Sequence, residues 1–208
     1  MAKQDRAIRT RQALLDAASI EFDASGYLAT RLVDISSRAG VTRGSLYFHF
    51  DSKADVASAL ATYQYERWAE YIPRRRHEGY RGVRLVMLFA HDLVVGFRDD
   101  VASRSAVALI KERRQVEADL PTPFQGWIDQ VSVLLVEARD DGELGQFVNI
   151  DDAAWLIVAS VFGIQEVGDQ LEQRQGICER LDSLWLYLLP GLGVSNAAGY
   201  VDDVVAAA

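Results

Sequence analysis

Residues 32–53, LVDISSRAGVTRGSLYFHFDSK, decide the fold of the N-terminal part of the chain. They begin with apolar residues at the spacing of one helix face, Leu32, Ile35 and Ala39. Gly40 can end this helix, because glycine readily takes the positive φ that is common at a helix C-terminus. Thr42 can then cap a second helix over residues 43–49, since its hydroxyl accepts hydrogen bonds from free N–H groups of the first turn. The stretch therefore predicts two helices joined by a tight turn.

The second helix of this pair predicts a surface for DNA. Only Leu46 and Phe50 are needed to hold it against a core, and its other residues are mostly small, polar or aromatic. A helix-turn-helix places its second helix in the DNA major groove, where such side chains contact bases and phosphates. The alternative is an ordinary pair of antiparallel helices, because short glycine turns are common in such pairs.

The string AGVTRGSLYFHFDSK at residues 39–53 closely resembles the DNA-binding signature of the TetR family of bacterial repressors, AGVSxGxxYxHFxxK, and the match begins near Thr10. The resemblance implies a homodimer that binds double-stranded operator DNA of pseudo-palindromic sequence. The residues expected to contact this DNA are Thr30, Arg31, Thr42, Arg43, Gly44, Ser45, Tyr47, His49 and Lys53.

Arg31 and Lys53 are expected to meet the DNA backbone for different reasons. The family usually has two hydroxyl residues at positions 30 and 31, one of which caps the next helix and meets a phosphate. Arginine cannot cap in this way, so we expect Thr30 to be the cap, while Arg31 can still reach the DNA backbone. Lys53 lies in the first turn of the following long helix, where its charge opposes the helix dipole. A DNA phosphate is therefore its expected partner.

The rest of the chain predicts an all-α protein, because apolar residues keep a helical period and no alternating strand pattern is long enough to indicate a sheet. The expected helices cover residues 7–24, 52–73, 81–97, 103–117, 122–140, 151–170 and 176–189, besides the helix-turn-helix. Residues 74–76 are expected in a solvated loop, and the tail after Gly191 is expected to fray. We divide the chain into a three-helix DNA-binding domain, 1–53, and a helical ligand-binding and dimerisation domain, 54–208. The helix that begins near Ser52 would link them mechanically.

The charge of the chain is unevenly distributed. The net charge is −8, yet residues 1–53 hold eight basic and six acidic side chains, which leaves −10 on the remainder. A basic end on an acidic body would orient the approach to DNA.

Composition excludes several classes of protein. With 208 residues and 50% hydrophobic content, the chain can form a proper core. No uncharged apolar run reaches the ~18 residues of a membrane span, and the N-terminus lacks the apolar region of a signal peptide, so we expect a cytoplasmic protein that does not enter a membrane. The single cysteine, Cys178, cannot form an internal disulfide. The three histidines are scattered and no catalytic or metal-binding spacing is visible, so we expect no enzyme and no cofactor.

The middle helices predict a cavity for a small molecule. Apolar residues and uncharged amides share these helices, which suits a neutral, oxygenated ligand. The residues expected to line the cavity are Gln64, Leu88, Phe89, Leu109, Trp127, Gln130, Val161 and Gln165. The segment LPTPF at 120–124, followed by Trp127, resembles the γ-butyrolactone receptor branch of the family, in which a tryptophan at this position lines the pocket. The alternative is that Trp127 is an ordinary core residue.

Two helices, 151–170 and 176–189, are more apolar than a monomer needs. Together with the resemblance, this indicates a two-fold four-helix interface between two copies. The residues expected there are Trp155, Val158, Phe162, Leu181, Leu184, Trp185 and Leu188. The alternative is a helix pair that is entirely interior to one copy.

The sequence therefore favours a dimeric transcriptional repressor that a γ-butyrolactone, butenolide or furan signal releases from its operator. One alternative is a regulator of efflux or catabolism that senses another small apolar ligand. The other is a DNA-binding factor without a ligand.

Overall fold

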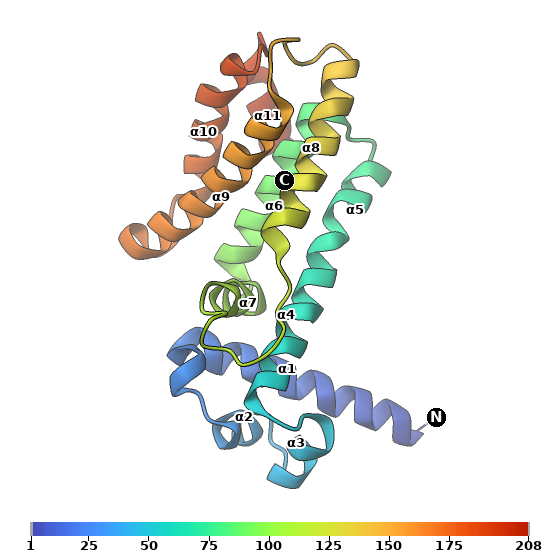
Figure 1. The fold of residues 1–208 in the computed structure, drawn as a ribbon, viewed down its shortest axis with the longest axis vertical. Helices are drawn as coiled ribbons and strands as arrows, with labels where there is room; N and C mark the ends of the chain where they lie inside the picture. Colours follow the sequence, from blue (N-terminus) through green and yellow to red (C-terminus); the bar gives the residue numbers. More distant parts are fainter. Residues whose placement is uncertain (1, 208) are drawn as a thin grey trace. The chain divides into compact units, whose positions relative to one another are not determined.

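A computed structural model describes residues 2–207. This part of the chain is all-α, as the sequence predicts (Figure 1). The helices are α1 (Ala2–Ala29), α2 (Leu32–Arg38), α3 (Arg43–His49), α4 (Lys53–Ala69), α5 (Tyr71–His77), α6 (Gly82–Asp99), α7 (Val101–Lys111), α8 (Pro123–Asp140), α9 (Ile150–Glu172), α10 (Ile177–Gly191) and α11 (Ala197–Ala207). Within the described residues, no helix has the length and apolar character needed to cross a membrane.

The helices form two compact units. Unit 1 comprises residues 1–67 and 100–122, and unit 2 comprises residues 68–99 and 123–208. This partition differs from the expected boundary between residues 53 and 54. The reason is that Leu60 of α4 and Leu109 of α7 are buried in the same apolar core as α1, α2 and α3.

Unit 1 is organised around α1. This helix is longer than expected and is interrupted at Gly26, whose positive φ of 73° a residue with a side chain would adopt only under strain. Leu15 and Phe22 are buried beneath α2 and α3 as part of the unit 1 core. Ile8, seven residues before Leu15 and so on the same side of an ideal helix, is exposed. The buried face of α1 therefore begins after Ile8.

The helix-turn-helix has the expected local structure. Ile35 of α2 and Leu46 of α3 are completely buried, so the two helices share one core. Gly40 ends the first helix with a φ of 67°. The Thr42 hydroxyl accepts a hydrogen bond from the Ser45 N–H at 3.2 Å and caps the second. Residues close together in sequence thus determine this turn.

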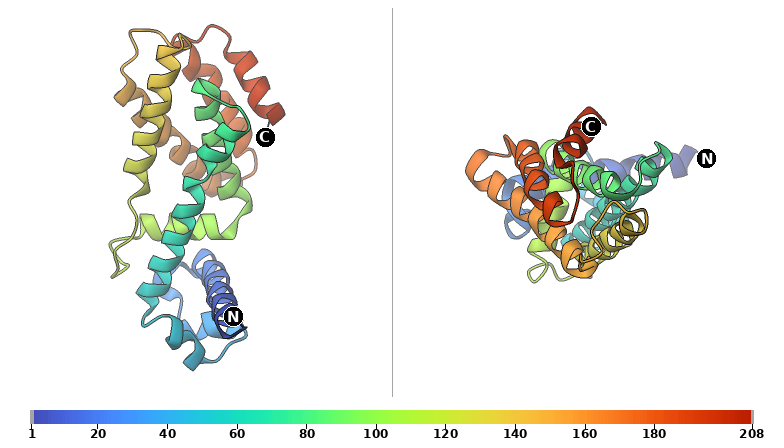
Figure 2. Two further views of the ribbon diagram at one scale, coloured as in Figure 1. Left: turned by 90° about the vertical axis from the view of Figure 1, so that its right-hand side faces the viewer. Right: turned by 90° about the horizontal axis from the view of Figure 1, so that it is seen from above.

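Unit 2 is built around α6, which packs against α5, α8, α9, α10 and α11 (Figure 2). Most of α6 is buried, which explains why apolar residues cover nearly its whole circumference. The helices expected at 122–140, 151–170 and 176–189 are confirmed with small changes in length. Pro190 lies in the last turn of α10 rather than after it.

Two segments of unit 2 are more ordered than the sequence indicated. The expected loop at 74–76 belongs to α5, and Arg75 is buried because its guanidinium donates to both Asp92 carboxylate oxygens at 2.7 and 3.0 Å. Arg75 also donates to the Ala207 carbonyl at 3.1 Å. The expected frayed tail is the helix α11, and Arg84 of α6 binds Asp203 on it at 2.6 Å. Long-range ion pairs therefore hold segments that look unstructured in the sequence.

Candidate nucleic-acid interface and ligand cavity

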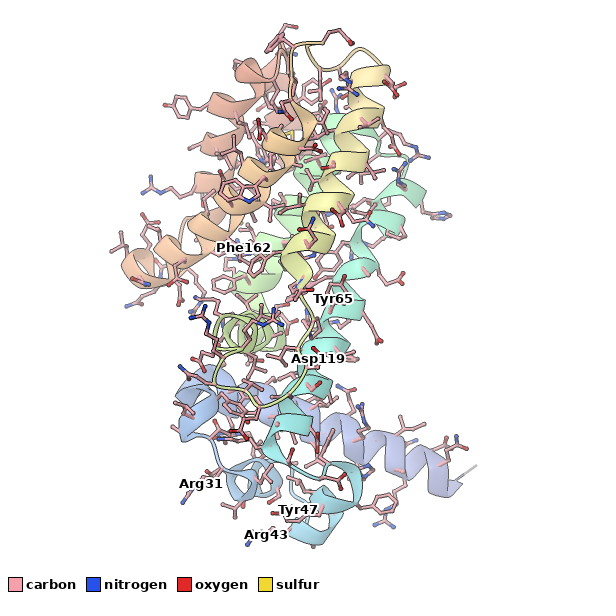
Figure 3. All side chains as sticks on the ribbon, in the orientation of Figure 1. Arg31, Arg43, Tyr47, Tyr65, Asp119 and Phe162 are labelled. Atoms are coloured by element: carbon pink, nitrogen blue, oxygen red, sulfur yellow. The ribbon has the colours of Figure 1, made fainter. Side chains whose placement is uncertain are left out.

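The outer face of α3 brings together most of the residues expected to contact DNA. Thr42, Arg43, Gly44 and Tyr47 are exposed, and Ser45 and His49 are half-buried beside them. The Arg43 guanidinium lies 6.0 Å from the centre of the Tyr47 ring, because the two residues are one helical turn apart. Figure 3 shows Arg31, Arg43 and Tyr47 at the end of unit 1 that α2 and α3 form. This surface offers a cation, hydroxyl groups and aromatic rings on a helix held by its opposite face.

One exposed residue of α3 was missed by the sequence analysis. Phe48 has 79% of its side-chain surface exposed, more than Tyr47 at 45%. The available signal was its position: it is one turn beyond Gly44, whereas the buried residues Leu46 and Phe50 lie on another face.

The expected role of Thr30 is wrong, because this residue is buried inside unit 1. Only 2% of its surface is exposed. Its hydroxyl lies 2.8 Å from the Gly26 carbonyl and 3.1 Å from the Glu21 carbonyl, to which it donates. Thr30 therefore ties the end of α1 and neither caps α2 nor faces a phosphate.

The N-cap of α2 is Arg31, so the expectation that Thr30 caps this helix is wrong. The Asp34 carboxylate accepts a hydrogen bond from the Arg31 N–H at 3.3 Å and two more from its guanidinium at 2.9 Å each. Asp34 thus satisfies the N–H of the N-cap residue, and the Asp34 N–H, which an N-cap hydroxyl would otherwise accept, donates to the Arg31 carbonyl at 3.0 Å. The Arg31 side chain stays 74% exposed, so its contact with the DNA backbone remains a prediction.

Lys53 has a structural role that the sequence argument did not anticipate. Its Nζ donates to the carbonyls of Tyr27, Thr30 and Leu28 at 2.7, 2.9 and 3.2 Å. The ammonium also lies 4.3 Å from the centre of the Tyr27 ring, and its partial burial lowers the pKa of Lys53. An ammonium has three donors, and these carbonyls occupy all of them. In this geometry, Lys53 therefore has no N–H left for the expected contact with a DNA phosphate.

The end of α1 is also held by the segment that contains α7. Glu112 accepts a hydrogen bond from the Tyr27 N–H at 3.3 Å, and Arg104 pairs with Asp23 at 3.1 Å. These contacts cross more than 80 positions of sequence. The end of α1 is therefore held inside unit 1 both by Lys53 of α4 and by the segment that contains α7. We call the exposed face of α3, which carries Arg43 and Tyr47, the reading surface.

Replacing Lys53 by methionine tests whether this lysine is a structural support. Lys53→Met should lower the free energy of unfolding by about 2 kcal/mol, because charge-assisted hydrogen bonds in a partly buried site are lost. DNA binding should weaken while the slope of log affinity against log salt concentration stays unchanged, since no phosphate contact is removed.

Arg31→Met is the matched control, because it removes an exposed cation of the same unit. A phosphate contact by Arg31 predicts that the magnitude of the salt slope falls by about one, with little change in melting temperature. If Lys53→Met instead reduced the slope and left the melting temperature unaltered, Lys53 would be a phosphate ligand.

Unit 2 contains a narrow apolar cavity whose free volume is about 10 Å³. Its walls come from α6, α8 and α9, and they are Val86, Phe89, Ala90, Leu93, Trp127, Val131, Ile157, Val158, Val161 and Phe162. This volume is about that of one water molecule and far below the roughly 300–1,000 Å³ typical of small-molecule sites. A ligand larger than this space must push the walls apart.

Trp127 forms the aromatic wall of this cavity. Its ring stacks on Phe162 with centroids 5.0 Å apart and planes inclined by 19°. Trp68 and Phe124 meet Trp127 edge-on at 5.1 and 5.8 Å. Only 5% of Trp127 is exposed, so it is both a core residue and a wall of the cavity.

The structure divides the other expected ligand residues. Phe89 and Val161 line the cavity with Trp127, whereas Gln130 is exposed and Leu88 is buried outside the lining. Two more belong to unit 1, namely Gln64, which donates to Ser103 Oγ at 2.7 Å, and Leu109, which lies in the apolar core. The helical period identified inward faces, but it could not distinguish a cavity wall from solid core.

Gln165 lies on α9 one turn beyond the cavity residue Val161, but it is not part of the lining itself. It is almost fully buried, and its Nε2 donates to the carbonyl of the cavity residue Leu93 at 3.3 Å. Its Oε1 is a buried atom that has no hydrogen-bond partner in the described structure. A buried acceptor of this kind costs free energy unless a donor reaches it.

Comparison with known proteins identifies the family. Residues 14–60 match the model of bacterial regulatory proteins of the tetR family, and residues 86–194 match that of the tetracyclin repressor-like C-terminal domain. The chain is 31% identical over 206 residues to the A-factor receptor protein of Streptomyces griseus, covering 97% of this chain and 70% of the relative. The chain belongs to the TetR family.

Solved structures of TetR-family proteins agree with this assignment. A gamma-butyrolactone receptor described as an ArpA-like protein is 29% identical with a TM-score of 0.82, and the match covers 96% of each chain. CprB from Streptomyces coelicolor, in complex with its biological operator sequence, is 29% identical with a TM-score of 0.84 over 96% of this chain and 97% of that chain. The family consists of DNA-binding transcriptional regulators, and this TetR-family chain resembles receptors for gamma-butyrolactones.

TetR regulators bind operator DNA as dimers, and α9 and α10 carry a suitable apolar surface here. Val158, Leu181 and Trp185 were expected on it but are buried, and Phe162 faces the cavity. Trp155 is exposed as expected, and Leu184 and Leu188 are half-buried. Other exposed apolar residues of these helices, which were not among those expected at the interface, are Leu156, Val167, Leu171, Leu186 and Tyr187.

Proposed function

We propose that this TetR-family chain is a homodimeric repressor whose α3 enters the major groove of operator DNA. The exposed face of α3 carries this proposal: Arg43 and Tyr47 project from a helix whose other face is fixed by Leu46. Arginine can bind a guanine edge with two hydrogen bonds or pair with a phosphate, and a tyrosine hydroxyl can donate to a phosphate. Two copies related by a two-fold axis would read a pseudo-palindrome.

Removing the two side chains tests the reading surface. Arg43→Ala should cost about 1 to 3 kcal/mol of binding free energy if the guanidinium contacts a base. The double variant Arg43→Ala, Tyr47→Ala should lose specific binding in a mobility-shift assay on DNA selected by the wild-type protein. Both side chains are exposed, so folding should persist.

Arg81→Ala provides the control, because it removes an exposed arginine of unit 2 that lies outside α9 and α10. It should bind the selected DNA like the wild type. Full operator affinity in the double variant would refute the assignment of α3 as the reading helix.

We further propose that a γ-butyrolactone, butenolide or furan-type signal occupies the cavity beside Trp127. The apolar walls suit an alkyl chain, and the free Oε1 of Gln165 can accept a hydrogen bond from a ligand hydroxyl. Similarity to the A-factor receptor protein supports this ligand class. A ligand releases DNA only if it binds better to a form of the dimer whose two reading helices do not fit the DNA.

Thermal shift and tryptophan fluorescence test the cavity together. A lactone signal that binds the folded protein should raise its melting temperature and change its indole emission. Trp127→Phe keeps an aromatic ring against Phe162 and should fold. Trp127→Ala is less suitable, because truncating a buried tryptophan costs about 3 to 5 kcal/mol of stability. We expect Trp127→Phe to lose the emission change and to require more ligand for release from DNA.

Trp155→Phe is the matched control, since Trp155 is exposed and lies outside the cavity lining. It should keep both responses. An unchanged ligand response in Trp127→Phe would mean that Trp127 is a core residue with no role in ligand binding. A wild-type protein that no lactone stabilises would favour a regulator with another ligand or with none.

The apolar surface of α9 and α10 predicts the dimer contact. Leu171 and Tyr187 are 76% and 86% exposed, which is costly for large side chains unless a partner covers them. Light scattering should show that Leu171→Asp, Tyr187→Asp is a monomer with weakened operator binding. Val205→Asp on α11 changes an apolar residue that is 55% exposed and should remain dimeric. A dimeric double variant would place the interface elsewhere.

A further inference from the structure

Phe48 is an apolar side chain on a face that the proposed function assigns to DNA. Its ring is 79% exposed, and it meets the ring of His49 edge-on at 5.1 Å. A single exposed hydrophobic residue is ordinary on a protein surface. Its place on the reading helix makes it informative, because groove contacts there determine which bases are accepted.

The neighbourhood of Phe48 leaves its ring open to a flat partner. Gly44 lies one helical turn before it, so the two residues form one stripe along α3. A Cβ at Gly44 would have a single neighbour within 4 Å, Thr42 Oγ1 at 3.9 Å, so the surface beside the ring is bare backbone. Arg43 and Tyr47 form the adjacent stripe, which carries the polar groups. The face of α3 thus has one polar and one apolar stripe.

We infer that Phe48 is a specificity-determining residue that contacts the 5-methyl group of a thymine in each half of the operator. This inference rests on the proposed function of α3. In the major groove thymine presents a methyl group beside its O4 acceptor, whereas cytosine has only a hydrogen at C5 and the purines present the N7 acceptor. A phenyl ring has no donor for a phosphate and gains free energy mainly by covering apolar surface. The thymine methyl is therefore the groove feature that fits this ring.

The size of the effect follows from the area that one methyl group buries. A methyl-sized group taken out of water contributes roughly 0.8 kcal/mol, which corresponds to about fourfold in affinity. Deoxyuridine pairs like thymidine and keeps O4, so it removes this contribution and leaves the hydrogen-bonding pattern of the base pair intact.

The experiment replaces thymidines of the selected DNA by deoxyuridine, one symmetry-related pair at a time, and measures affinity by fluorescence anisotropy. For the wild-type protein, one such pair of positions should weaken binding about fourfold per half-site. Phe48→Ala should bind the thymidine DNA more weakly and should bind the thymidine and deoxyuridine forms of that position equally. Phe48 is exposed, so its replacement should leave the melting temperature unchanged.

Tyr47→Phe is the matched variant, because it alters the neighbouring aromatic residue and leaves Phe48 in place. It should keep the preference for thymidine. If the wild type binds every deoxyuridine form as tightly as the parent DNA, or if Phe48→Ala keeps the same preference, the inference is overturned while the proposed function stands. If the wild type selects no DNA at all, the proposed function and the inference both fail.

Discussion

The bond between the Lys53 ammonium and the end of α1 is the interaction on which the reading surface depends. Its hydrogen bond to the Thr30 carbonyl, 2.9 Å long, closes the segment of residues 30–53 that contains α2 and α3. A second bond, to the Tyr27 carbonyl at 2.7 Å, fixes that closed segment to α1. These hydrogen bonds restrict the conformations of residues 30–53 before DNA binds. Less conformational entropy is then lost when α3 binds DNA. Glu112 secures the same end of α1 from the side of α7.

The sequence predicted those parts of the fold that neighbouring residues determine. Gly40 and Thr42 act within one turn of their positions, so the helix-turn-helix could be placed with correct limits. Thr30 and Lys53 could not be understood in this way, because their partners lie on α1 and a competing local explanation was available for each. The same holds for Arg75, whose burial depends on Asp92 and on the distant carbonyl of Ala207.

The cavity was predicted only in part, because a cavity wall and a solid core have the same apolar pattern. Phe89, Trp127 and Val161 line the cavity as expected, but nothing in their spacing separates them from Leu88, which does not. Trp127 stacks on Phe162 in the cavity wall, and Gln165, one turn beyond Val161 on α9, has a buried Oε1 without a hydrogen-bond partner in the described structure. A ligand that satisfies this acceptor and opens the narrow space can favour one packing of unit 2 over another.

Ligand control of DNA binding is a coupling free energy, and it must be the same when measured from either side. The direct test is a closed set of four titrations: operator affinity with and without a saturating lactone, and lactone affinity with and without saturating operator. Negative coupling of roughly 1 to 3 kcal/mol should weaken both affinities by one common factor between about 5 and 150. Equal operator affinities with and without a lactone that demonstrably binds would contradict ligand control of this repressor.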